Sequence, residues 1–259
     1  MAKFQDLVDL FAGESEEPEY LLRRVHNFVR DEIMFGWTAQ FDQADPDYTL
    51  SVGRGHCVPQ ARLFTSLLRA LGFDARMRFV EIRRDILYGT FPDSFYALVP
   101  ERISHAYAVV KLGDKTLNID SFIADPQYFF NARSRLLSTE REMGFGIHRD
   151  GRINLSLKED SFCQFADSAM MLKDLGFSDF AEEHAIHANH VTKIAPFLSL
   201  AAILKLSPGL VSKLNEPVEE IRAPRVLLES VFKSYVRPAS RSDLSTLPGG
   251  LDEHHQRLS

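Results

Sequence analysis

Residues 53–76 read GRGHCVPQARLFTSLLRALGFDAR, and one apolar helix face runs through them. Its members recur at i, i+4, i+7, i+11 and i+14, which is the spacing of an α-helix. They are Cys57, Ala61, Phe64, Leu68 and Leu71. Gly72 is placed to end the helix, because glycine adopts the left-handed conformation found after many helix ends. We therefore predict a helix that begins at Cys57 and stops near Gly72.

The segments on either side of this helix differ in their periodicity. Two helical patterns precede it, over residues 4–11 and after Pro18, and they are followed by a loop-like stretch over 36–54. Strand patterns follow it at residues 75–82, 104–112 and 116–122. This order predicts an α+β fold in which the Cys-bearing helix packs on an antiparallel sheet.

The sequence pattern of the second half of the chain indicates two further regions after the core. From about residue 160 the pattern returns to helix, and the last residues are rich in Ser, Pro, Gly and Arg. We expect a catalytic core with its N-terminal helices over 1–155, a helical C-terminal extension over 156–237 and a mobile tail over 238–259.

Composition excludes several classes of protein. The chain has 259 residues, a net charge of −6 and no basic run, so nucleic acid and anionic lipid are poor partners. No apolar run approaches the ~20 residues that a membrane span needs. The N-terminus lacks the pattern of a secretion signal, and two cysteines make no disulfide framework. We expect a cytoplasmic protein.

Cys57 occupies a position that suits a nucleophile. Unpaired N–H groups and the helix dipole favour negative charge at a helix start, so they stabilise a thiolate over a thiol. The same N–H groups can stabilise a developing oxyanion. Cys163 has no helix-start context, and we expect it to be structural.

A base and an orienting carboxylate are found in the next two strands. His105 opens the strand 104–112, and Gly113-Asp114 is a turn signal. If that turn has two residues, Leu112 pairs with Lys115, and Asp120 lies on the same face as His105 and diagonal to it. A turn of three residues would put Asp120 on the opposite face. The two-residue register predicts a nucleophile–base–orienter triad of Cys57, His105 and Asp120.

Three blocks of sequence resemble the transglutaminase-like superfamily of cysteine enzymes. The first is Gly53-Arg54-Gly55-His56-Cys57 with the helix end Leu67-Leu68-Arg69-Ala70-Leu71-Gly72 and the strand start Ala75-Arg76; the others are His105-Ala106-Tyr107 and Asn118-Ile119-Asp120. The resemblance covers about residues 20–125. It implies a papain-like fold with Cys57 as nucleophile, His105 as base and Asp120 as orienter. The order and spacing of the triad more distantly resemble arylamine N-acetyltransferases.

The sequence departs from that family at two places. Tyr107 stands where the family often carries Trp after His-Ala. The upstream oxyanion donor has no clear match, although Trp37, Gln40 and Gln43 lie in the right loop. Gln40 and Trp37 each have a side-chain N–H for this role. We therefore treat Gln40, Trp37 and Tyr107 as oxyanion or substrate residues.

These residues predict acyl chemistry through a thioester at Cys57, with no metal or organic cofactor. The expected substrate is a peptide, an amide or a thioester-linked acyl group, and the first expectation is hydrolysis or transfer of an amide acyl group with narrow specificity. One alternative is an amide-forming acyltransferase that uses a carrier-protein or coenzyme A thioester. Another is a binding module that keeps the fold without catalysis. The aromatic insert over 85–103 has the composition of a lid or wall.

Overall fold

The structure is a computed structural model, and it describes residues 4–164, 170–178 and 207–223. All of them lie in one compact unit, Met1–Ala223. The helices are α1 (Phe4–Glu14), α2 (Pro18–Glu32), α3 (Pro46–Val52), α4 (Cys57–Ala70), α5 (Asp93–Tyr96), α6 (Pro126–Leu137) and α9 (Pro208–Arg222), with 3-10 turns at Phe41–Gln43 and Arg84–Leu87. The strands are β1 (Met34–Phe35), β2 (Arg54–Gly55), β3 (Ala75–Arg83), β4 (Arg102–Leu112), β5 (Lys115–Ile119), β6 (Met143–Gly144), β7 (Ile147–His148) and β8 (Lys173–Ser178).

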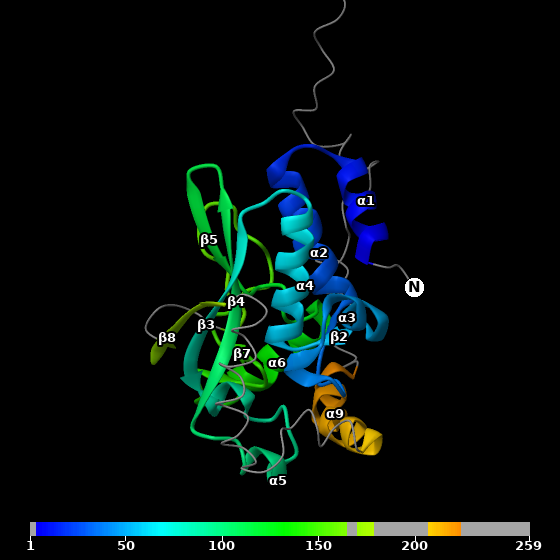
Figure 1. The fold of residues 1–259 in the computed structure, drawn as a ribbon. Coiled ribbons are helices and arrows are strands. Elements are labelled where there is room, and N and C mark those ends of the chain that lie inside the picture. The colour runs from blue at the N-terminus through cyan, green and yellow to red at the C-terminus, as the bar shows by residue number, and fades with distance from the viewer. Residues whose placement is uncertain (1–3, 165–169, 179–206, 224–259) are drawn as a thin grey trace, which may run out of the picture. The chain divides into compact units, whose positions relative to one another are not determined.

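The main sheet has four antiparallel strands in the order β5-β4-β3-β8 (Figure 1). Helix α4 packs against β3 and β4, and α2 packs against α4. On β4, the small residues Ala106, Ala108 and Val110 belong to the core that α4 shares, and all three are fully buried. The α+β arrangement expected from the sequence, a Cys-bearing helix on an antiparallel sheet, is confirmed.

Helix α4 begins and ends where its sequence predicts. Cys57 is its first residue, and the expected apolar positions Ala61, Phe64 and Leu68 are buried. At its end, Gly72 has a φ of +88°, Phe73 N–H donates to Leu68 O at 3.0 Å and Gly72 N–H to Arg69 O at 3.0 Å. These two bonds form a Schellman motif, which satisfies carbonyls that a helix end otherwise leaves unpaired.

The hairpin between β4 and β5 has the two-residue turn that the triad argument required. Leu112 pairs with Lys115, and Ala108 pairs with Ile119. Gly113 adopts a φ of +59° at the turn. Strand β5 ends at Ile119 instead of continuing to residue 122, because the N–H groups of Asp120 and Ser121 donate to Ser161 O at 3.0 and 3.1 Å.

Three helices lie where no helix was expected: α5 is a single turn within the insert 85–103, and the other two are longer. Helix α3 falls within the stretch 36–54, which we expected to be a loop, and α6 follows β5. Both begin at an Asp-Pro pair. The side chain of Asp45 accepts the N–H of Tyr48 at 2.7 Å, and Asp125 accepts the N–H of Tyr128 at 3.0 Å. An Asp N-cap followed by proline in the first turn is a sequence signal for a helix start, and it could have located both.

The region 156–237, expected to be a helical extension, contains a strand. Residues Lys173–Ser178 form β8, which pairs with β3 at the edge of the main sheet, so sequence beyond residue 155 completes the sheet. The pairing register shifts between Phe79 and Val80, and Gly176 has a φ of +85°. Such an irregular strand lacks the alternation that identifies strands from sequence. Helix α9 is the described helix of this region, and the tail 238–259 lies outside the described residues.

None of the helices among residues 4–164, 170–178 and 207–223 is long and apolar enough to cross a membrane.

Candidate active site

Cys57 lies at the N-terminal end of a largely buried helix. It is a free thiol, half-buried, at the first position of α4, and the rest of this helix is largely buried. Gln60 N–H donates to His56 O at 3.1 Å, and Pro59 has no N–H. The N–H groups left without an intrahelical acceptor are therefore those of Cys57 and Val58.

His105 joins Cys57 to Asp120. Its ring is buried, and Nε2 lies 2.9 Å from Asp120 Oδ2. A second hydrogen bond links the ring to the Cys57 side chain. Since Nε2 is occupied by Asp120, Nδ1 is the ring nitrogen that faces the sulfur. The structure thus brings together the three residues of the predicted triad in one hydrogen-bonded row.

The surroundings of His105 favour its charged form. Burial alone would lower the pKa of the imidazole, but hydrogen bonds to Asp120 and Cys57, together with their charges, raise this pKa from 6.5 to about 9. At neutral pH the ring is therefore an imidazolium. Because the folded pKa exceeds the unfolded one, protonation of His105 stabilises the fold fully below pH 6.5, and this contribution is lost as the pH rises through about 9.

Asp120 is held by backbone from a distant part of the chain. The carboxylate has no solvent exposure, and its Oδ1 accepts the N–H groups of Cys163 and Gln164, the latter at 3.2 Å. A Cβ on Gly151 would collide with the carbonyl of Cys163, so the approach of this segment requires glycine. Burial raises the pKa of the Cys163 thiol well above its usual value. Cys163 therefore contributes a backbone N–H, and its side chain is buried as an uncharged thiol.

The three residues expected at the oxyanion or substrate site lie in different surroundings. Trp37 is buried, and its indole Nε1–H donates to Thr90 O at 3.2 Å. Gln40 is half-buried, directly before the 3-10 turn Phe41–Gln43. Tyr107 stacks beside His105 on the same face of β4, with ring centroids 6.4 Å apart. The Trp37 N–H is thus already engaged within the protein.

Two polar side chains near Cys57 were not singled out by the sequence as structural anchors. Gln60 is fully buried, and its Nε2 donates to the carbonyls of Ile33, Gly55 and Ile123 at 2.9–3.2 Å. His56 is also buried, and its Nε2 lies 2.6 Å from Asp42 Oδ1. Both residues tie the start of α4 to neighbouring loops.

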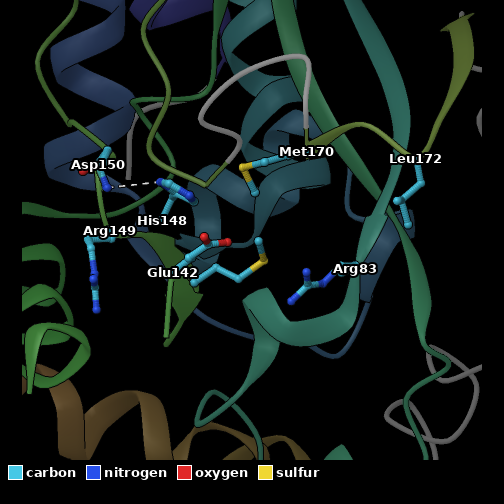
Figure 2. A pocket seen from close by; sticks show the side chains of 8 residues that line it. Arg83, Glu142, His148, Arg149, Asp150, Met170 and Leu172 are labelled. Atoms are coloured by element: carbon cyan, nitrogen blue, oxygen red, sulfur yellow. Dashed lines mark hydrogen bonds between the residues drawn. The ribbon is translucent and has the colours of Figure 1, made fainter. Parts of the chain in front are cut away.

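A pocket of about 420 Å³ lies beside the β6–β7 hairpin (Figure 2). Its lining combines charged and apolar side chains: Arg83, Glu142, Met143, His148, Arg149, Asp150, Met170 and Leu172. The Asp150 N–H donates to His148 Nδ1 at 3.1 Å. None of the triad residues lines this pocket, and the described part of the chain offers no group of three His, Cys, Asp or Glu side chains that could hold a metal ion.

Replacing Asp120 with Asn should lower the pKa of His105. The Asn side chain keeps an oxygen for the N–H groups of residues 163 and 164 but removes the negative charge that favours the imidazolium. We expect an NMR titration to show the His105 ring losing its proton at a lower pH in Asp120→Asn than in the unmodified protein. Asp114→Asn, at the exposed β4–β5 turn, is the control and should leave the titration unchanged. A His105 pKa that stays the same or rises in Asp120→Asn would contradict this electrostatic account.

Comparison with known proteins finds one family model that resembles part of the chain. Residues 5–121 match the sequence model of the transglutaminase-like superfamily, and no curated protein matches the chain significantly. The matched segment includes α4, β3, β4, β5 and all three residues of the triad. Residues 5–121 of this chain are therefore similar to the transglutaminase-like superfamily.

Proposed function

We propose that the protein is a cysteine enzyme that transfers acyl groups through a thioester at Cys57. The observation that carries the proposal is the row of hydrogen bonds from Cys57 through His105 to Asp120, at the start of a helix. A nucleophile, a base within hydrogen-bond reach and a group that orients the base are the parts that covalent acyl transfer requires. The similarity of residues 5–121 to a superfamily of cysteine enzymes supports the same chemistry.

The first half-reaction uses the proton of His105. The Cys57 thiolate attacks the carbonyl carbon of the acyl donor, and the electron pair of the C=O bond moves to the oxygen. As the tetrahedral intermediate collapses, the bond to the leaving group breaks, and the His105 imidazolium gives its proton to the departing amine or thiol. The products are a thioester on Cys57, a neutral imidazole and the released leaving group.

The second half-reaction reverses these roles. The neutral His105 ring removes a proton from an incoming water or amine, which attacks the thioester carbonyl. Collapse of this intermediate returns Cys57 to the thiolate and leaves His105 protonated, so the enzyme regains its starting state. Asp120 stays ionised throughout and holds the imidazole in one orientation.

We assign the oxyanion to the helix start and to the loop before it. The N–H of Cys57 is one donor, because it has no intrahelical acceptor. Of the two side chains considered for a second donor, Trp37 already donates to Thr90 O, which favours Gln40.

The insert over 85–103 supports narrow specificity. Phe91 of the insert stacks on Trp37 with ring centroids 4.2 Å apart, and Trp37 in turn lies 5.2 Å from the ring of His56, the neighbour of Cys57. The buried Phe91 therefore anchors the insert to the segment that precedes the helix start, and we propose that the insert forms one wall of the site. A walled site suits one small or extended acyl donor better than the varied segments of an unfolded protein.

Alkylation kinetics test the activation of Cys57. We expect iodoacetamide to modify Cys57 much faster than Cys163 at neutral pH, because Cys57 is half-exposed and bonded to His105 whereas Cys163 is fully buried. Peptide mapping by mass spectrometry measures both rates. His105→Gln should slow the modification of Cys57, and His148→Gln, on β7, should not. Equal rates for the two thiols in the folded protein would remove the basis for activation.

Digestion of unfolded casein tests the specificity. With the wall in place, we expect little cleavage of casein, at few sites, over a time in which a small activated ester is turned over. Cys57→Ala identifies any cleavage that does not depend on the nucleophile. Rapid cleavage at many unrelated sites that is abolished by Cys57→Ala would refute narrow specificity and leave the acyl chemistry intact.

A further inference from the structure

We propose that Asn215 of α9 is a positioning residue for the active site, acting through the loop that begins at Trp37. The inference rests on the proposed function for its kinetic consequence, but the structural part stands independently. Helix α9 lies outside residues 5–121, the segment that matches the family.

The side chain of Asn215 forms hydrogen bonds with both the backbone N–H and the backbone carbonyl of Trp37. The Trp37 N–H donates to Asn215 Oδ1 at 2.8 Å, and Asn215 Nδ2 donates to Trp37 O at 2.9 Å. The Asn215 side chain is itself buried and also donates to Val211 O at 2.9 Å within its own helix. A primary amide can donate and accept hydrogen bonds at the same time. The Asn215 side chain therefore takes the part that the backbone of a neighbouring strand plays in a sheet.

The same pattern occurs two residues earlier. Met34 and Gly36 direct their N–H groups to the β2 segment, donating to Gly53 O at 3.0 Å and Gly55 O at 2.9 Å. Phe35 faces the other way: its N–H donates to Asp125 Oδ2 at 3.3 Å, and its carbonyl accepts from Arg222 Nη2 at 2.6 Å. Alternate residues of a strand present their polar groups to opposite sides. Side chains of Asp125, Arg222 and Asn215 therefore take the place of a third strand beside β1.

Close packing makes this arrangement specific. A Cβ on Gly36 would lie 2.7 Å from both Asn215 Oδ1 and Arg54 Nη1, so the approach of α9 requires glycine there. Arg222 forms a buried ion pair with Asp125 at 2.9 Å, which fixes the end of α9 next to the start of α6. The helix is thus held in register with the segment 35–37.

From Trp37 the restraint reaches His56, the residue before the nucleophile, and the loop that carries Gln40. The Trp37 ring contacts those of Phe91 and His56, and the loop continues to Asp42, whose carboxylate bonds His56 at 2.6 Å. Arg62 of α4, also buried, donates to the carbonyls of Asp42 and Ala44 at 2.9 and 2.5 Å. The loop that carries Gln40 is therefore fixed against α4 at one end and against α9 at the other.

Tryptophan fluorescence tests the restraint without any substrate. Trp37 is the single tryptophan of the chain, so intrinsic emission reports on this segment alone. We expect Asn215→Ala to shift the emission to longer wavelength and to increase quenching by acrylamide. Lys213→Ala, exposed on the same helix, should change neither. Leu214→Ala, which removes a fully buried side chain of α9, controls for a general loss of stability.

Kinetics with p-nitrophenyl acetate, measured well below the melting temperature of every variant, test the consequence for the active site. Displacements of about 1 Å can reduce turnover on the order of a hundredfold. We expect kcat to fall by about tenfold or more in Asn215→Ala, with KM little changed. Alkylation of Cys57 should keep its rate, because Asn215 does not touch the triad. Leu214→Ala should lower the melting temperature and leave kcat unchanged.

The outcomes separate this inference from the proposed function. Unchanged Trp37 emission in Asn215→Ala would overturn the inference, whatever the activity. So would an altered emission with unchanged kcat, or an equal loss of kcat in Leu214→Ala, since either would reduce Asn215 to a structural role. Absence of any Cys57-dependent turnover in the unmodified protein would instead overturn the proposed function. The fluorescence result would then still decide whether Asn215 holds the Trp37 segment.

Discussion

The two carboxylate oxygens of Asp120 bind different partners, and the rest of the site depends on both sets of hydrogen bonds. Oδ2 holds the His105 ring, whereas Oδ1 accepts two backbone N–H groups from residues 163 and 164. A buried carboxylate needs such partners, because removing one partner of a buried charge pair costs on the order of 3–5 kcal/mol. The same bonds draw a distant segment against the end of β5. The electrostatics of the site and the path of the chain are thus set by one side chain.

The sequence predicted the parts of the fold that depend on local periodicity. A pattern within a short stretch of sequence identifies each of three features. They are the helix from Cys57, the strands around His105 and the two-residue turn at Gly113-Asp114. Because the turn sets the register, the side of the sheet on which Asp120 lies also followed. Helices α3 and α6 were missed although each has an Asp-Pro start. Helix α3 has seven residues, whereas the buried Tyr128, Ala132 and Leu136 of α6 follow helical spacing and could have been recognised. Strand β8 was missed because its pairing with β3 is a tertiary interaction across about a hundred residues of sequence.

Contacts that complete the site join residues far apart in sequence, so the local sequence pattern around each residue could not predict them. The backbone of Cys163 that supports Asp120, the side chain of Asn215 on Trp37 and the Asp125–Arg222 pair beside β1 all join segments far apart in sequence. Residues 5–121 contain the three residues of the proposed triad, whereas these three contacts involve residues beyond 121. Such second contacts are what hold reacting groups in a productive geometry. The chain after residue 121 therefore supports the site that we propose.

Formation of a covalent acyl adduct tests the central claim most directly. The protein is incubated with p-nitrophenyl acetate, and its intact mass is followed with time, with peptide mapping to locate the modification. The account predicts one acetyl group, on Cys57, that forms rapidly and then decays as water or an added amine removes it. His105→Gln should slow its formation, and Cys57→Ala should abolish it. An adduct that forms equally well in Cys57→Ala, or no adduct in the unmodified protein, would contradict the account.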